Sequence, residues 1–286
     1  MKIIKNKNLK EYTTFKIGGK ANFFVDAKSI NDIVNAVSFA RNRNISFVIL
    51  GNGSNILVDD KGYRGMVIKV ANLGCRINGN MLECQAGTPL SYLVSRAASN
   101  SLSGVECLVG IPGTLGGAIV GNAGTKNKSI SKIIRSVKIL QNGKIKEVEN
   151  SYFKFSYRDS KIKKTNDVIL AATLELKKSD KTQIEKIQSK ILKLRKNQPK
   201  GYSAGSIFKN PKKIKVGELI EKAGLKGLER GGAQISSKHA NFIINKGKAT
   251  SSDIKYLISK IQKDVFLKFG VLIEREIRYL GEKGWE

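Results

Sequence analysis

Short runs of apolar residues, several of them alternating with polar ones, are separated along the chain by glycine- and asparagine-rich turns. Runs of this length predict β-strands. The predicted strands lie at 21–27, 46–50, 56–58, 65–70, 81–85, 133–140, 144–149 and 167–176. The pair Asn142-Gly143 between two of them is typical of a tight hairpin turn, so those two strands are expected to be neighbours.

Amphipathic patterning predicts helices at about 29–44, 89–99, 181–196 and 250–268. Ser29 with Asp32, and Thr250 with Asp253, have the spacing of capping boxes at the start of the first and last helix. The strands come in runs rather than in strict alternation with helices, which predicts an α+β fold. A Pro/Gly/Ser stretch follows the lysine-rich third helix, so a domain boundary is expected near 195–206.

Composition is typical of a globular protein with a packed core. The chain has 286 residues, 41% of them hydrophobic, which is enough for a sizeable core. Its apolar runs are too short to span a bilayer, and its first residues lack the apolar region of a secretion signal. We therefore expect no membrane insertion and a cytoplasmic location. Cys75, Cys84 and Cys107 form an odd set without C-x-x-C spacing, which predicts free thiols, no disulfide framework and no metal site.

The charge is strongly positive, with 52 basic against 23 acidic residues and a net charge of +29. Such a charge suggests a nucleic-acid partner. Lysines, however, are spread through every segment, and no basic block is interleaved with aromatic residues as a base-stacking surface requires. The pattern favours an anionic small-molecule ligand, steered by the same charge, over nucleic acid.

Two segments concentrate glycine: "LGNGSNILVDD" at 50–60 and "GIPGTLGGAIVGNAG" at 110–124. Glycine permits positive φ and close backbone approach, so successive N–H groups can line an anion site suited to a phosphate or diphosphate. Neither segment fits the Rossmann fingerprint, and the chain contains no P-loop motif. One such loop is more often a structural turn, whereas two together favour a dinucleotide site.

Three further segments carry candidate chemistry. Ser206, in "YSAGSIFKNP" at 202–211, lacks the G-x-S-x-G turn of nucleophilic serines, and a relay with the single histidine, His239, lacks an evident third partner. In "VLIEREIRYL" at 271–280, strand alternation puts Glu274, Glu276 and Arg278 on one face, either as a solvated salt-bridged surface or as part of a site. The segment "FSYRDS" at 155–160 is either a turn or an anion clamp.

These motifs, with "TTFKIGG" at 13–19, occur in the order found in the UDP-N-acetylenolpyruvoylglucosamine reductases, the MurB flavoenzymes of peptidoglycan synthesis, and the chain resembles that family nearly end to end. It lacks a tyrosine-bearing insertion and so resembles the shorter subgroup. The resemblance implies a two-lobed FAD-binding fold of the vanillyl-alcohol-oxidase (PCMH) type, followed by an α+β substrate-binding domain. The implied domains are lobe 1 at 1–72, joined by the last strand at 270–286, lobe 2 at 73–199, and the substrate-binding domain at 200–269.

The resemblance also implies a reaction. NADPH reduces non-covalently bound FAD, and the flavin passes hydride to UDP-N-acetylglucosamine enolpyruvate, giving UDP-N-acetylmuramate. Ser206 matches the family's proton donor, Arg158 the arginine that stabilises developing charge on the substrate carboxylate, and Glu276 the catalytic glutamate, with Glu274 not excluded by spacing. A monomer is expected. A related flavin oxidase with covalently attached flavin is disfavoured, because neither glycine loop contains histidine.

The remaining implied site residues fall into two groups. The implied FAD contacts come from the two glycine loops: Gly51, Asn52, Gly53, Ser54, Asn55, Gly110, Gly113, Thr114, Gly116, Gly117, Asn122, Ala123 and Gly124. The implied substrate contacts are Tyr157, Lys209, Asn210, Gln234, His239 and Arg278.

Overall fold

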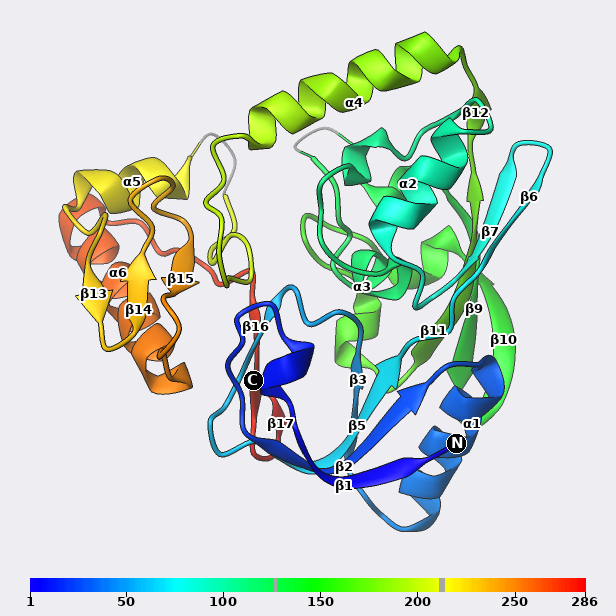
Figure 1. The fold of residues 1–286 in the computed structure, drawn as a ribbon, viewed down its shortest axis with the longest axis horizontal. Helices are drawn as coiled ribbons and strands as arrows, with labels where there is room; N and C mark the ends of the chain where they lie inside the picture. Colours follow the sequence, from blue (N-terminus) through cyan, green and yellow to red (C-terminus); the bar gives the residue numbers. More distant parts are fainter. Residues whose placement is uncertain (126–127, 211–213) are drawn as a thin grey trace. The chain divides into compact units, whose positions relative to one another are not determined.

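The computed structural model describes residues 1–125, 128–210 and 214–286 (Figure 1). The chain divides into two compact units. Unit 1 contains residues 1–3, 25–52 and 67–196, and unit 2 contains residues 4–24, 53–66 and 197–286. The segments of the two units alternate along the sequence, so each unit is built from stretches that are far apart in the chain.

Unit 1 is centred on an antiparallel five-stranded sheet with the strand order β10-β9-β11-β7-β6. Its strands are β6 (Cys75–Asn78), β7 (Met81–Gln85), β9 (Ile134–Gln141), β10 (Lys144–Glu149) and β11 (Val168–Glu175). The central strand β11 is almost continuously apolar and buried, as a strand covered on both faces requires. The predicted hairpin between β9 and β10 is confirmed, with positive φ at both Asn142 and Gly143.

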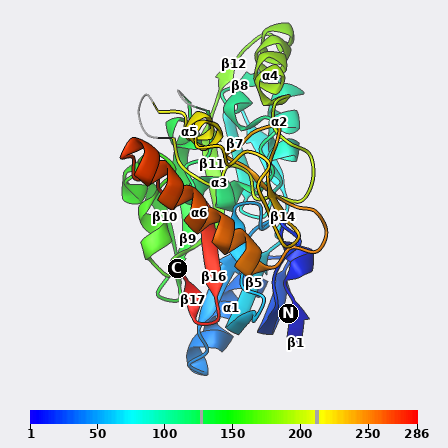
Figure 2. The same ribbon diagram turned by 90° about the vertical axis from the view of Figure 1, so that its left-hand side faces the viewer.

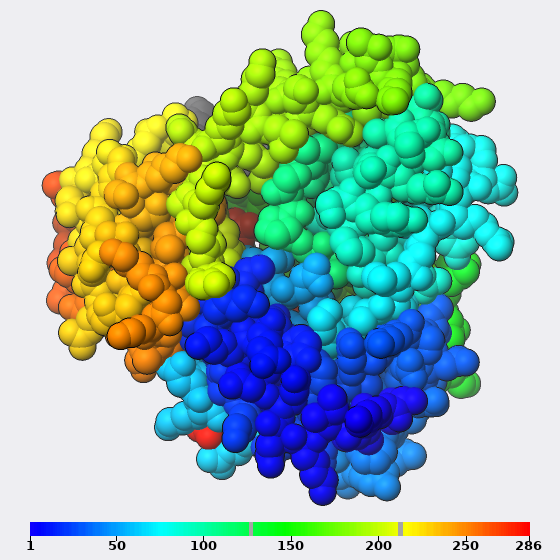
Figure 3. Space-filling model, in the orientation of Figure 1, coloured from blue at the N-terminus to red at the C-terminus, as the bar shows by residue number. Residues whose placement is uncertain are grey.

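The described residues of unit 1 form four α-helices: α1 (Ile30–Asn42), α2 (Leu90–Ala98), α3 (Leu115–Val120) and α4 (Lys181–Arg195). The short helix α3 packs on β7 and β11, while α4 packs on α2 and on the 3-10 turn Glu106–Leu108. Helix α4 buries only Ile184, and Figure 3 shows its yellow-green side chains at the surface. Two short strands, β8 (Leu102–Ser103) and β12 (Lys177–Lys178), pair with each other.

Unit 2 contains a three-stranded sheet of β13 (Glu229–Arg230), β14 (Ala233–Ile235) and β15 (Ile243–Asn245). It packs on α6 (Ser251–Phe269), which Figure 2 shows along its length, and α6 also packs on α5 (Val216–Lys222). A second sheet holds β4 (Ile56–Val58), β16 (Arg278–Gly281) and β17 (Gly284–Trp285), with β4 and β16 parallel. One apolar core joins these parts, from Phe15 and Leu57 to Phe208, Ile258 and Tyr279.

A four-stranded sheet has the order β1-β2-β5-β3, with β1 (Ile3–Asn8), β2 (Lys20–Ala27), β3 (Phe47–Leu50) and β5 (Tyr63–Val70). Strands β2 and β5 each contribute residues to both units. No helix among the described residues is long and apolar enough to cross a membrane.

The predicted helix starts are confirmed by their caps. The Ser29 side chain accepts a hydrogen bond from the backbone N–H of Asp32 at 3.1 Å. Thr250 and Asp253 form a complete reciprocal capping box at the start of α6.

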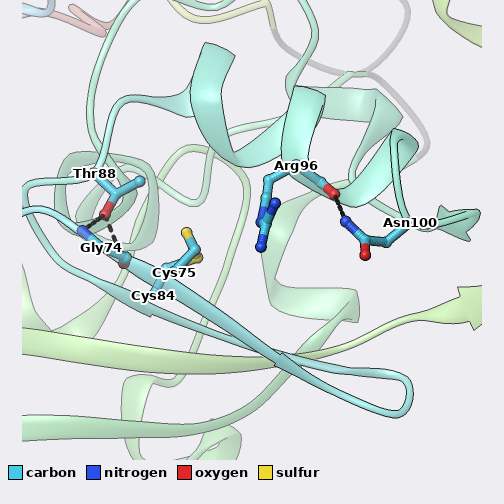
Figure 4. The surroundings of a disulfide bond; sticks show 6 residues. All are labelled: Gly74, Cys75, Cys84, Thr88, Arg96 and Asn100. Atoms are coloured by element: carbon cyan, nitrogen blue, oxygen red, sulfur yellow. Dashed lines mark hydrogen bonds between the residues drawn. A yellow bond between two sulfur atoms is a disulfide. The ribbon is translucent and has the colours of Figure 1, made fainter.

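The prediction that all three cysteines are free is wrong. Cys75 and Cys84 form a disulfide (Figure 4), and only Cys107 is a free thiol among the described residues. The two bonded residues face each other directly across the β6–β7 pair, with their Cα atoms 4.2 Å apart. Their spacing in the sequence gave no signal, because the register of the hairpin brings them together. Burial raises the pKa of the Cys107 thiol to about 11.

The prediction of one continuous strand over 271–280 is also wrong. Only Arg278–Gly281 forms a strand, and residues 271–277 belong to no strand, apart from a single bridge between Arg275 and Phe208. Ile273, Ile277 and Tyr279 are buried as the alternation predicts, but Leu280 is buried as well. Both faces of β16 are therefore covered, which sequence alternation cannot show.

Candidate active site

The two glycine loops approach each other within unit 1. A Cβ atom at Gly51 would lie 2.7 Å from Thr114 Oγ1, so only glycine fits at this position without a shift of the neighbour. Thr114 begins α3 and accepts a hydrogen bond from the backbone N–H of Gly117 at 3.3 Å. Gly116 packs on Ala86, to whose carbonyl its N–H donates at 2.8 Å. Gly51, Thr114 and Gly116 thus hold two loops and strand β7 in close backbone contact.

The rest of the second loop is also built on backbone contacts. Gly110 and Gly113 have positive φ, and the Gly113 carbonyl accepts from Leu90 N–H at 3.0 Å. Ala123 donates to the Ala118 carbonyl at 2.8 Å. A Cβ at Gly124 would collide with the Lys128 carbonyl oxygen.

The segment 155–160 is a tight turn attached to the second glycine loop. Ser156 and Asp159 exchange backbone hydrogen bonds of 3.1 and 3.2 Å, and Arg158 adopts a positive φ of 56°. Asn122 Nδ2 donates to the Ser156 carbonyl at 2.7 Å, and Ser160 Oγ donates to the Val120 carbonyl at 2.7 Å. The turn carries Tyr157 and Arg158 between these attachment points. Asn122 therefore fixes the position of this turn through its side chain.

In unit 2, the remaining residues of the first loop support the C-terminal strand. Gly53 has a positive φ, and its carbonyl accepts from Thr14 N–H at 3.1 Å. Ser54 follows. Asn55 Nδ2 then donates to the Glu276 carbonyl at 3.2 Å, and the Asn55 carbonyl accepts from Arg278 N–H at 3.0 Å. Asn55 therefore hydrogen-bonds to the backbone on both sides of Ile277.

Ser206 lies beside the same C-terminal segment. The carbonyl of Ile207, its neighbour in the chain, accepts from Glu276 N–H at 2.8 Å, and Lys209 N–H donates to the Glu274 carbonyl at 2.9 Å. Ser206 and Glu276 are both half-buried. The structure thus brings the serine and the glutamate of two separate motifs to one place.

The two glutamates of that segment have different surroundings. Glu274 is largely exposed and pairs with Lys209, whose Nζ lies 2.7 Å from Glu274 Oε1. Glu276 is half-buried, with its backbone bound to Ile207 and Asn55. This geometry favours Glu276 over Glu274 as a site residue.

Several predicted substrate contacts already have protein partners. Asn210 Oδ1 accepts from Val216 N–H at 2.9 Å at the start of α5. Gln234 Nε2 donates to Glu229 Oε1 at 2.8 Å. The Arg278 guanidinium lies 4.0 Å from the centre of the Trp285 ring. Pro211, the last residue of the serine motif, lies outside the described residues.

His239 has a structural setting. Its Nδ1 accepts from Asn241 N–H at 3.2 Å, and its ring packs where a Cβ on Gly217 would lie, 3.0 Å from Cε1. Burial lowers the pKa of the imidazole, so the neutral form is favoured. Within the described part of the chain, no hydrogen bond joins His239 to Ser206, and the Ser206–His239 relay is not formed.

Sequence reasoning missed Asn241, which holds the serine segment in place. Its Oδ1 accepts from Phe208 N–H and its Nδ2 donates to the Phe208 carbonyl, both at 2.9 Å, while its own carbonyl accepts from Ile207 N–H at 2.9 Å. Asn241 is 1% exposed. The sequence offers one signal for Asn241, its position next to the apolar stretch 242–244. That position does not predict which backbone groups the side-chain amide binds.

Comparison with known proteins places the chain in a family. Residues 21–149 match the family model of the FAD binding domain, and residues 197–280 match that of the UDP-N-acetylenolpyruvoylglucosamine reductase C-terminal domain. A UDP-N-acetylenolpyruvoylglucosamine reductase from Caldicellulosiruptor bescii is 42% identical over 99% of this chain and 92% of its own length. This chain belongs to the UDP-N-acetylenolpyruvoylglucosamine reductase family.

Two further reductases of this family agree with that assignment. The one from Caldanaerobacter subterraneus subsp. tengcongensis is 42% identical, covering 99% of this chain and 95% of its own. The crystal structure of the Thermus caldophilus reductase aligns with 97% of this chain and 98% of its own, with a TM-score of 0.86 at 33% identity. These findings confirm the α+β architecture of an FAD-binding domain followed by the family's C-terminal domain. Both glycine loops lie inside the range that matches the FAD binding domain, which confirms FAD as the predicted cofactor.

Proposed function

We propose that this enzyme uses NADPH and FAD to reduce UDP-N-acetylglucosamine enolpyruvate to UDP-N-acetylmuramate, a step in peptidoglycan precursor synthesis. Family membership over almost the whole chain supports the reaction. The observation that carries the site assignment is the hydrogen bond from Glu276 N–H to the Ile207 carbonyl, which brings the segments of Glu276 and Ser206 together.

The glycine loops suit a bound dinucleotide. Gly51 leaves room where a Cβ would meet Thr114 Oγ1, so the two loops approach each other closely. We propose that the loop residues between 51 and 55 and between 110 and 124 named above hold FAD non-covalently. FAD held there would supply hydride-transfer chemistry between NADPH and the terminal vinyl carbon of the substrate.

The chain's own residues would act on the substrate. Addition of hydride to the enolpyruvyl group drives negative charge onto its carboxylate, and Arg158 would stabilise that charge with its permanent, planar cation. Glu276 would hydrogen-bond the developing enolic oxygen. Ser206 would then give its hydroxyl proton to the neighbouring carbon, a centre basic enough to take it.

Other parts of the assignment are proposals of the same kind. Tyr157, Lys209, Asn210, Gln234, His239 and Arg278 are proposed to contact substrate. The two FAD-binding lobes are proposed to span 1–72 with 270–286, and 73–199, with the substrate-binding domain at 200–269. We also propose that the enzyme acts in the cytoplasm as a monomer.

Replacing Ser206 by Ala tests the proton-donor assignment. Reduction of the flavin by NADPH, followed by its absorbance, should survive in Ser206→Ala. Turnover of the enolpyruvyl substrate should fall by about 10²–10⁴-fold, the usual contribution of a positioned acid. Ser203→Ala, in the same segment, is the control and should keep both half-reactions. If Ser206→Ala turns over substrate at the wild-type rate, the assignment is wrong.

A further inference from the structure

Arg195, the last residue of α4, places a half-buried guanidinium group against the second glycine loop. An ideal Cβ on Gly110 would lie 3.0 Å from Arg195 Cδ and 3.6 Å from its Nε. Gly110 itself has a φ of +70°. The absence of a side chain at Gly110 therefore leaves the space that the arginine occupies.

Among the described residues, no ion pair neutralises the Arg195 guanidinium. Arg195 Nε is buried and has no hydrogen-bond partner among the described residues. Glu106, next to Cys107 in the chain, accepts from Gly104 N–H through Oε2 at 2.8 Å, and its Oε1 is buried without a hydrogen-bond partner. None of the ion pairs found in the described chain joins it, or any other carboxylate, to Arg195. A cation at a helix C-terminus is favoured by the helix dipole, but that effect does not require a buried, unsatisfied Nε.

A second cation lies nearby in the same unit. Burial is the main cause that lowers the pKa of Arg195, and repulsion from Arg158 is the next. The repulsion between these two guanidinium groups costs free energy, as does the buried Arg195 Nε–H without a partner. A bound anion would remove both penalties, and phosphate oxygens match the planar donors of arginine.

We propose that Arg195 binds the diphosphate of a nucleotide at the Gly110 end of the second glycine loop. This inference rests on the proposed function, which supplies the diphosphates: that of FAD, or that of NADPH or the UDP-linked substrate. Arg195 is thereby a ligand-binding residue contributed by α4, outside the glycine motifs and beyond the range that matches the FAD binding domain.

The test measures nucleotide affinity in Arg195→Met and Arg195→Lys. Apoprotein is titrated with FAD and with riboflavin, which lacks phosphate, and quenching of flavin fluorescence gives Kd. In the holoenzyme, NADPH affinity is taken from the concentration dependence of flavin reduction, and UDP-N-acetylglucosamine affinity from perturbation of the flavin spectrum. Leu192→Ala is the matched control, because Leu192 also packs against Gly110 (3.3 Å to the ideal Cβ) but is uncharged.

Arg195→Met should raise Kd for one of the diphosphate ligands by about 10- to 100-fold, the loss of a charge-assisted hydrogen bond. Arg195→Lys should show a smaller rise, and riboflavin binding and Leu192→Ala should stay near wild type. The ligand whose Kd rises identifies the diphosphate. Unchanged Kd values for all three ligands in both arginine variants, or a rise for riboflavin equal to that for FAD, would overturn the inference. Wild-type apoprotein that binds no FAD would overturn the proposed function instead.

Discussion

Glu274 and Glu276 differ in exposure and in their neighbouring residues, although only one residue separates them. Lys209 and Glu274 form an exposed ion pair, and such pairs contribute little to stability. Glu276 is half-buried and stands beside the Ser206 segment. Alternation along a strand puts both on one face, so the sequence pattern alone cannot separate them.

We predict that Glu276→Gln lowers kcat/KM for the enolpyruvyl substrate by at least about 10²-fold, because the enolic oxygen loses a preorganised partner in the transition state. Glu274→Gln should remain within about 3-fold of wild type, as expected for loss of an exposed ion pair. Steady-state kinetics of both variants checks this, with flavin content as the control for folding. A larger loss in Glu274→Gln than in Glu276→Gln would reverse the assignment.

At the scale of elements, sequence signals between neighbouring residues predicted helices and hairpins well. They did not predict contacts between segments that are far apart in the chain. The capped helices α1 and α6 and the Asn142-Gly143 hairpin follow from residues close in sequence. Strand β1, helix α5 and the break of the C-terminal strand at Arg278 depend on partners elsewhere in the chain. The site motifs were recognisable in order, but the bidentate contact of Asn241 with Phe208 was not.

The Cys75–Cys84 disulfide should stabilise the β6 edge of the unit 1 sheet. The bond closes a loop between residues 9 apart in sequence. On the chain-entropy account, closing a loop of this size contributes about 2–3 kcal/mol. The double variant Cys75→Ser/Cys84→Ser should therefore lose about that much free energy of unfolding in urea titrations.

Reductant supplies the control for that measurement. Dithiothreitol should lower the stability of the wild type toward that of the double variant and leave the double variant unchanged. Equal stability of oxidised wild type and double variant would show that the bond adds nothing to the fold.

At the scale of the molecule, unit 2 joins early and late parts of the chain through β4 and β16. A hydrogen bond from the Tyr279 hydroxyl to Asp59 fastens this joint. Partial burial by itself would raise the pKa of Asp59, but the bonds from Tyr279 and Lys61 N–H and the charge of Lys255 together hold that pKa below its usual value. Burial, followed by the bond to Asp59, raises the pKa of Tyr279.

Tyr279→Phe should lower the free energy of unfolding at pH 7 by about 1.5–3 kcal/mol, the range for a hydrogen bond to a charged group. Because the folded-state pKa of Asp59 is depressed, its stabilisation is present above the unfolded value of about 3.9 and is lost as pH falls through the folded value. The difference between wild type and variant should therefore shrink below about pH 4. Urea titrations across pH check this, with the exposed Tyr256→Phe as the control. A difference that grows on acidification would contradict the assignment.

The hydrogen bond from Asn55 Nδ2 to the Glu276 carbonyl also has a consequence for folding. These residues are 221 positions apart in the sequence, and the parallel pairing of β4 with β16 spans a similar separation. Contacts between residues so far apart in sequence form slowly, because the conformational entropy of closing a long loop is lost before the contacts stabilise the chain. A ribosome-bound chain carries its first glycine loop long before the partner strand has been made. The enzyme would therefore acquire its proposed glutamate in position only after residues 278–281 have been synthesised and β16 has paired with β4.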